Sequence, residues 1–382
     1  MEKISCILLL FAYQCLSNTY SQERIITYTL NEEINNDLSE IIEEIRYVPL
    51  QSKEGFFIGR VTKVDQSDNN YFIYDRNNNS LFSYNNQGVP LISFSKKGKG
   101  PFEISRLSSF CLDRKNNLVI LHDGSSRKEL VFKNNGNRVS EKKTTFPSQD
   151  MCLTGSGNKA YYSGSSSFYA GSEVVKDYFF LTDKNDRLLN HFYNDPWKMH
   201  GMGVNSIFYY YRDTVIARVP FNDTIFYLSE KGLFPKYCID FGKNRLIRSQ
   251  LNISKISQVP SYAVSSHKYF INHYFVETSD WLVFDYSGQG KYFFGFVNKR
   301  NLQSWKFEYH NLLQSNHNPI IGNLAGGHDQ NIFFIVEPID FVEFIKHCES
   351  SFRIRSNFNE VKNKVKVDDN PILVIVTLRS SK

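Results

Sequence analysis

Short runs of alternating hydrophobic and polar residues, separated by turns rich in Asp, Asn and Gly, extend over most of this 382-residue chain. The clearest copy of the pattern covers residues 71–88 (YFIYDRNNNSLFSYNNQG), and residues 118–136 (LVILHDGSSRKELVFKNNG) repeat it. Alternation of this kind predicts half-buried strands joined by tight turns. The full unit recurs about every forty-five residues, which is the length typical of a four-stranded propeller blade.

The repeated unit can be followed from one end of the chain to the other. A repeat architecture lets one closed domain use a chain of this length, and six blades fit it better than five or seven. We therefore predict an all-β fold, a six-bladed β-propeller with four-stranded antiparallel blades. The expected blades are residues 61–88, 91–136, 160–189, 206–242, 281–307, and a sixth made of residues 331–336 together with 371–378.

The final apolar run, residues 371–378 (PILVIVTL), can pair with a segment from the other end of the chain, either residues 25–30 or residues 45–50. A blade shared between the two ends would remove the open sheet edges of the ring.

Three segments depart from the strand pattern. Residues 37–45 have apolar residues at helical spacing, and the polar stretch 339–352 also indicates a helix. Residues 243–270 form an insertion with helical character around 249–256, too short to bury a core of its own.

Composition supports the all-β interpretation, because the chain holds 32 Phe and 23 Tyr, residue types that favour pleated, half-buried surfaces. The net charge is +6, yet Lys and Arg are dispersed, with local concentrations only at Lys96, Lys97 and Lys99 and at residues 353–366. A nucleic-acid-binding protein normally gathers such charge on one face. We expect no nucleic-acid partner.

The first residues have the pattern of a secretory signal peptide. Residues 4–13 form an apolar run that is too short to span a bilayer, and small polar residues follow it as far as Ser21. We expect a signal peptide at residues 1–21 and a mature propeller at residues 22–382, located in the periplasm or at the cell surface. The residues before Cys15 match a lipoprotein box poorly, so release is favoured over a lipid anchor. No later segment is apolar enough to cross a membrane.

Four cysteines remain after cleavage: Cys111, Cys152, Cys238 and Cys348. Isolated cysteines in strands are most often small core residues. Export permits disulfides, and their pairing stays open.

Four segments carry a family resemblance: residues 47–59 (YVPLQSKEGFFIG), 96–104 (KKGKGPFEI), 221–228 (FNDTIFYL) and 370–378 (NPILVIVTL). They resemble the exported six-bladed β-propeller proteins of the Bacteroidetes, which are distantly related to NHL-repeat propellers. The resemblance covers nearly all of the mature chain and implies an exported propeller that binds something. The second motif usually reads G-x-GPGEY in that family, whereas Phe102 stands here in place of the Gly after Pro.

The candidate ligand-binding residues belong to two local features. In the first, Gly98, Gly100 and Pro101 favour a tight turn, and Glu103 offers a carboxylate to a ligand or to backbone N–H groups. The alternative is a purely structural turn that orders the start of a blade. The second feature is His122 beside Asp123, at the end of a predicted strand. No catalytic motif such as G-x-S-x-G is present.

The function we predict is a ligand- or protein-binding module at the cell envelope, with a glycan, a peptide or an envelope protein as partner. Loops that connect the blades converge at one end of the channel. The Gly98–Glu103 turn, the 243–270 insertion and surplus aromatic rings in residues 207–211 and 292–296 would contribute to the binding face. No cofactor is expected on this interpretation.

The alternative is a metal-dependent lyase or hydrolase with a divalent ion on the propeller axis. Its ligands would come from several blades, with His122 as the first candidate. The other candidates are His200, His267, His273 and His328.

Overall fold

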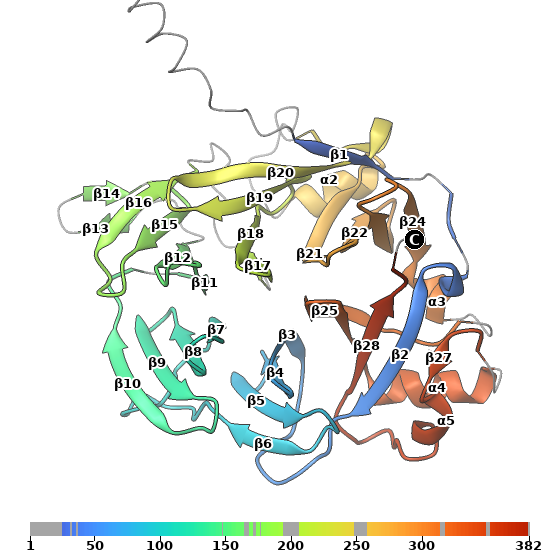
Figure 1. The fold of residues 1–382 in the computed structure, drawn as a ribbon, viewed down its shortest axis with the longest axis horizontal. Helices are drawn as coiled ribbons and strands as arrows, with labels where there is room; N and C mark the ends of the chain where they lie inside the picture. Colours follow the sequence, from blue (N-terminus) through green and yellow to red (C-terminus); the bar gives the residue numbers. More distant parts are fainter. Residues whose placement is uncertain are drawn as a thin grey trace, which may run out of the picture.

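The computed structural model describes residues 25–30, 33–35, 37–146, 148–163, 168–170, 173–175, 177–193, 206–247, 258–313, 318–348 and 352–380. Six antiparallel blades stand around a central axis, as the sequence predicted (Figure 1). In each blade the strand that follows the preceding blade along the chain lies nearest the axis.

The first three blades follow one another along the chain. Blade 1 holds β3 (Val61–Ser67), β4 (Asn70–Asp75), β5 (Ser80–Asn85) and β6 (Pro90–Ser93). Blade 2 holds β7 (Ser109–Asp113), β8 (Leu118–Asp123), β9 (Lys128–Lys133) and β10 (Arg138–Lys143). Blade 3 holds β11 (Asp150–Leu153), β12 (Lys159–Tyr162), β15 (Phe179–Thr182) and β16 (Leu188–Phe192), with a small hairpin of β13 (Phe168–Ala170) and β14 (Glu173–Val175) between its second and third strands.

The last three blades include both ends of the described chain. Blade 4 holds β17 (Phe208–Tyr211), β18 (Thr214–Arg218), β19 (Thr224–Ser229) and β20 (Gly232–Asp240). Blade 5 holds β21 (Phe270–Glu277), β22 (Trp281–Gly288), β23 (Lys291–Asn298) and β24 (Ser304–Glu308). Blade 6 holds β25 (Asn323–His328), β26 (Asn331–Val336), β28 (Ile372–Leu378) and β2 (Ile42–Pro49), extended by the short β27 (Arg355–Ser356).

The ring closes where β2 pairs with β28 in antiparallel register, with Tyr47 opposite Val374. Of the two N-terminal segments considered, residues 45–50 therefore provide the closure. The other segment has a different place: β1 (Ile26–Thr29) adds to the outer edge of blade 4, parallel to β20, with Ile26 opposite Tyr237.

The helix expected at residues 37–45 is wrong. Only a 3-10 turn forms there, η1 (Leu38–Glu40), and the side chain of Asp37 accepts a hydrogen bond from Ser39 N at 2.8 Å. Ile42 and Ile45 lie in β2 and are fully buried. Pairing of β2 with β28 and burial of these side chains outweigh the helical spacing.

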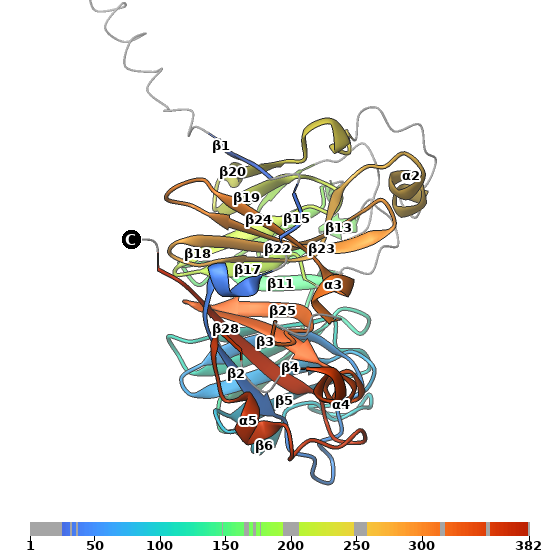
Figure 2. The same cartoon turned by 90° about the vertical axis from the view of Figure 1, so that its right-hand side faces the viewer.

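The helices gather on one face of the ring: α2 (Val259–Ser265), α3 (Tyr309–Leu313) and α4 (Pro338–His347) (Figure 2). Helix α4 confirms the helix expected in residues 339–352. The 243–270 insertion contains η2 (Gly242–Asn244) and α2, while its expected helical part at residues 249–256 lies outside the described residues. A further short helix, α5 (Phe358–Val361), packs near β2. No described helix is long and apolar enough to span a bilayer.

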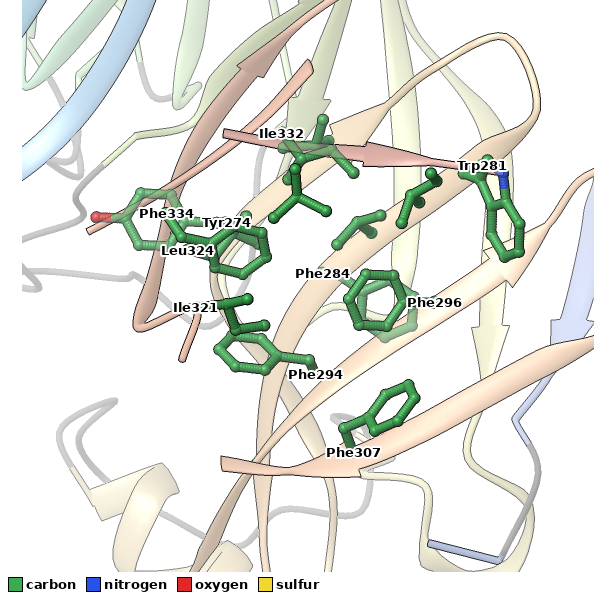
Figure 3. Close-up of a cluster of buried hydrophobic side chains, with 14 of the residues drawn as sticks. Tyr274, Trp281, Phe284, Phe294, Phe296, Phe307, Ile321, Leu324, Ile332 and Phe334 are labelled. Atoms are coloured by element: carbon green, nitrogen blue, oxygen red, sulfur yellow. The ribbon is translucent and has the colours of Figure 1, made fainter. Parts of the chain in front are cut away.

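The core lies between neighbouring blades, and aromatic rings dominate it. Figure 3 shows Phe284, Phe294 and Phe296 of blade 5 facing Ile332 and Phe334 of blade 6. The rings of Phe294 and Phe334 meet edge to face, with centroids 5.5 Å apart. Because both faces of a blade are covered by neighbours, its strands carry apolar residues on both sides. Most of the aromatic surplus in residues 292–296 is therefore core.

The predicted blade boundaries are displaced by about a strand at several points. Strand β6 completes blade 1 rather than opening blade 2, and β11 begins blade 3 ahead of the expected residue 160. The pattern is ambiguous here, because a turn between blades has the same composition as a turn within one.

Candidate functional site

A pocket of about 430 Å³ lies beside the N-terminal ends of α3 and α4, two of the helices on one face of the ring. Tyr309 begins α3, and Glu337 directly precedes α4, so one residue at the N-terminal end of each helix lines the pocket. The remaining lining comes from blades 5, 6 and 1. The lining residues are Arg60, Val61, His273, Tyr274, Tyr292, Tyr309, Asn323, Leu324, Ala325, Ile335 and Glu337.

The wall on blade 5 is shaped by a buried carboxylate. Strand β21 has an irregular register against β22 between Ile271 and Phe275. At this irregularity Asp285 accepts hydrogen bonds from His273 N (3.1 Å) and Tyr274 N (2.6 Å), and also from the Tyr292 hydroxyl. Asp285 therefore fixes three lining residues at once.

A hydrogen bond from a pocket residue links blades 5 and 1. The Tyr274 hydroxyl donates to Thr62 O of β3 at 2.5 Å. Strand β25 of blade 6 lies between these two blades and approaches β3 closely, because a Cβ on Gly326 would stand only 2.2 Å from Val64 O. The three inner strands that contribute to the pocket are thus packed tightly against one another.

Three guanidiniums, those of Arg60, Arg76 and Arg218, lie near the blade 5 and blade 1 side of the pocket, together with the carboxylates of Asp75 and Asp285. Arg60 is exposed, and its guanidinium makes no hydrogen bond or ion pair within the described part of the chain. Arg218 is 1% exposed; it donates a long hydrogen bond, 3.5 Å, to Ile271 O and also interacts with the Tyr209 hydroxyl. Burial lowers the pKa of His273; the guanidiniums of Arg218, Arg60 and Arg76 lower it further, while Asp285 opposes them. His273 is therefore a neutral side chain near pH 7.

The opposite wall offers hydrogen-bond acceptors and a planar amide. Glu337 is half-buried, and burial raises its pKa, with Asp340 and Asp75 adding to the shift. Asn323 is exposed at the start of β25. The pocket thus combines tyrosine rings with donors on one side and acceptors on the other.

The predicted Gly98–Glu103 turn lies elsewhere, in the connection between blades 1 and 2. The Glu103 carboxylate accepts a hydrogen bond from Gly100 N at 2.9 Å and pairs with Lys96 Nζ at 3.0 Å. The Gly100 hydrogen bond, followed by Lys96, lowers the pKa of Glu103. A Cβ on Gly98 would lie 2.0 Å from a Glu103 oxygen, so a side chain there would displace the Glu103 carboxylate. These contacts agree with the structural alternative; ligand binding by Gly98, Gly100, Pro101 and Glu103 stays a prediction.

Phe102 keeps the backbone shape that the family's glycine favours. Its φ is +53°, in the left-handed region. Its ring packs edge to face on Phe132, with centroids 5.8 Å apart, and the Arg138 guanidinium lies 5.0 Å from its centroid. Side-chain packing therefore accompanies a conformation that is unusual for a non-glycine residue.

The side chains of His122 and Asp123 both make hydrogen bonds within the protein. His122 is fully buried, and its Nε2 lies 2.5 Å from Ser148 Oγ. Asp123 accepts hydrogen bonds from Ser105 N (2.7 Å) and Arg106 N (3.1 Å). All six predicted site residues thus lie in or beside the connection between blades 1 and 2, and none of them lines the pocket.

The histidines proposed as metal ligands are dispersed. His273 lines the pocket, His267 is exposed after α2, His328 ends β25 away from the pocket, and His200 lies outside the described residues. Among the residues that the structure describes, no group of three or more His, Cys, Asp or Glu side chains could hold a metal ion. The convergence on His122 that the enzymatic alternative requires is not found in that part of the chain. Cys111, Cys152, Cys238 and Cys348 are free.

Several pocket residues were missed at the level of sequence, namely Arg60, Tyr309, Asn323 and Glu337. Among these residues, Arg60 lies closest to a feature noted in the sequence, because it directly follows the 47–59 motif. Residues 292–296 did draw attention for their aromatic rings, and Tyr292 is the ring of that run that reaches the pocket.

Residues 25–377 match a family described as a domain of unknown function, DUF4934. The chain belongs to this family. None of the curated proteins matches it. Its fold is similar to the crystal structure of a Bacteroides fragilis protein whose name presumes that it is exported: the TM-score is 0.79 at 20% identity, over 94% of this chain and 100% of that one.

A DUF4221 family member from Bacteroides vulgatus is more distant, with a TM-score of 0.49 at 8% identity over 89% of this chain and 97% of that one. At these identities the likeness concerns the fold alone. The relation to NHL-repeat propellers stays a prediction.

Proposed function

We propose that this protein is an exported binding module that takes a small polar ligand of saccharide type into the pocket beside the N-terminal ends of α3 and α4. The observation that carries the proposal is the convergence of three tyrosines and four polar side chains, from three blades, on one pocket of about 430 Å³. That volume lies in the range of small-molecule sites, which usually combine apolar walls with a few placed polar groups.

The lining favours a saccharide over a peptide. Tyr292 and Tyr309 present flat rings with a polar end, Asn323 both donates and accepts, and Glu337 accepts hydrogen bonds, a set suited to a ring that carries hydroxyl groups. Extended peptides are commonly held by an exposed sheet edge. Side chains from several segments line this pocket instead.

Export rests on the signal-like residues 1–21 and on the similar fold of a protein presumed to be exported. The mature chain would then begin at residue 22, act in the periplasm or at the cell surface, and be released rather than anchored at Cys15.

Calorimetric titration of residues 22–382 with a panel of oligosaccharides tests the proposal. We expect Tyr309→Ala to weaken binding about tenfold or more, through lost ring contact. Tyr227→Ala is the matched control, because Tyr227 is a half-buried tyrosine on β19 that does not line the pocket. A panel without any binding, or equal affinity in both variants, would reject the pocket as the site.

A further inference from the structure

We infer that the ligand is an acidic saccharide, one that carries a carboxylate or a sulfate ester, and that Arg60 binds this group. The inference rests on the proposed function and adds the charge of the ligand and the residue that selects it. The observations behind it are the two guanidiniums beside the pocket and the partners of the nearby carboxylates.

The Arg60 guanidinium is available to a ligand while its backbone is held in place. Arg60 N donates to Asp75 Oδ1 at 2.9 Å, and Arg60 O accepts from Arg76 N, also at 2.9 Å. The side chain lines the pocket, is exposed, and has no partner among the residues that the structure describes. A guanidinium in this state matches the planar oxygens of a carboxylate or sulfate through two parallel hydrogen bonds.

Arg218 provides a second, buried cation behind the pocket wall. It is 1% exposed, and its Nε has no hydrogen-bond partner in the described chain. It donates a long hydrogen bond to Ile271 O, two residues before His273 of the pocket wall, and it also interacts with the Tyr209 hydroxyl. None of the described carboxylates forms an ion pair with it. Burial of a charge is unfavourable, and an anion in the pocket would add to the compensation that the nearby Asp285 gives.

None of the described carboxylates around the pocket forms an ion pair with the Arg60 guanidinium. Asp75 and Asp285 accept hydrogen bonds from backbone N–H groups of β3 and β21 or the residues before them. Glu337 and Asp340 belong to the start of α4, on blade 6. A ligand therefore fits best with its acidic group toward Arg60 and its hydroxyl groups toward Glu337 and Asn323.

The test compares matched ligands that differ only in charge. Residues 22–382 are titrated with uronate oligosaccharides and with the same oligosaccharides after their carboxyl groups have been reduced to alcohols. Sulfated fragments before and after desulfation form a second arm, which distinguishes a sulfate ester from a carboxylate. We expect the acidic form of at least one pair to bind tenfold or more tightly than its neutral form, with an affinity that falls as salt is added.

Arg60→Gln should remove the preference for the acidic form, and Arg60→Lys should retain part of it. Arg106→Gln is the matched control, because Arg106 is also exposed, also precedes an inner strand and has its N–H bound by Asp123, yet lies outside the pocket. Equal binding of acidic and neutral forms, unchanged in Arg60→Gln, would overturn this inference and leave the proposed function standing. Absence of binding by either form would overturn both.

Discussion

Aspartates on the second strands of three blades accept hydrogen bonds from backbone N–H groups in, or shortly before, the inner strand of the same blade. Asp75 accepts hydrogen bonds from Gly59 N and Arg60 N, Asp123 from Ser105 N and Arg106 N, and Asp285 from His273 N and Tyr274 N. A carboxylate with two or more such bonds is satisfied internally. These residues therefore act on a ligand only indirectly, by positioning neighbours such as Arg60 and His273.

Asp123 was a reasonable candidate from the sequence, but in the structure its carboxylate holds the backbone of its own blade. A polar pair at a strand end indicates either a site or a turn, and periodicity does not distinguish the two. Arg60 had no such signal, because its importance depends on a pocket formed with residues more than two hundred positions away.

His122 leads to a prediction on pH dependence. Burial lowers its pKa below the usual 6.5, although Glu129, Asp123 and Asp150 oppose the shift. Because the unfolded chain then binds the proton more readily, His122 contributes stability above about pH 6.5 that is lost as the pH falls through that value and below. We expect the urea midpoint of His122→Gln to fall less than that of the natural protein between about pH 7.5 and 5.5.

His267→Gln provides the control, since His267 is exposed after α2 and should keep the natural pH profile. The urea midpoint of His122→Gln will still depend on pH, because burial also lowers the pKa of His273 and His328. An identical change of the urea midpoint with pH in the natural protein and in His122→Gln would contradict the prediction.

At the level of elements, most strands could be predicted from the sequence, but the blade to which each strand belongs could not. Alternation and Asx-rich turns located β4, β5, β8 and β9, because local pairing alone forms such hairpins. The assignment of β6 and β11 to blades, and of residues 42–45 to a strand, depended on distant partners. Ile45, for example, pairs with Val376.

The inner strand β25 shows how closely the blades are packed around the axis. Gly326 has φ +152°, and its missing side chain lets β25 lie against Val64 of β3. Gly327 similarly faces Val276 of β21, where a Cβ would lie 2.4 Å from a methyl carbon. Two adjacent glycines thus allow blade 6 to fit between its neighbours.

Substitution at Gly326 should be severe for this reason. Gly326→Ala adds a methyl group that collides with backbone, and we expect it to lower the free energy of unfolding by about 3 kcal/mol or more in urea denaturation. Gly232→Ala is the matched control: φ is +144° there, but no atom lies within 4 Å of the added carbon. Backbone strain alone should make that variant only about 1 kcal/mol less stable. Equal losses would show that the close approach of β25 and β3 is unimportant.

For the whole molecule, the number of blades followed from the repeat length, and closure between chain ends followed from the unpaired final strand. The pocket did not follow, because its lining is drawn from three blades whose order around the axis had to be known first. The N-terminal segment also joins three blades: β1 pairs with β20, Asn35 N donates to Lys306 O of β24, and β2 completes blade 6.

Truncation separates the two roles of this segment. A chain starting at residue 31 lacks β1 and should still unfold in one cooperative thermal transition, at a lower temperature than residues 22–382. A chain starting at residue 51 lacks β2, exposes the edge of β28 and should lose the cooperative transition and become sensitive to protease. Circular dichroism and limited proteolysis measure both. Cooperative melting of the shorter chain at the temperature of residues 22–382 would show that β2 is not needed for closure.

Both ends of the described chain lie toward the side of the ring that faces away from α2, α3 and α4 (Figure 2). Anything joined to either terminus, such as a fusion partner, an affinity tag or a surface, would consequently lie on the side of the ring opposite these helices. Immobilised through either end, the protein would present its helix-bearing side to the surrounding solution, where ligands diffuse freely.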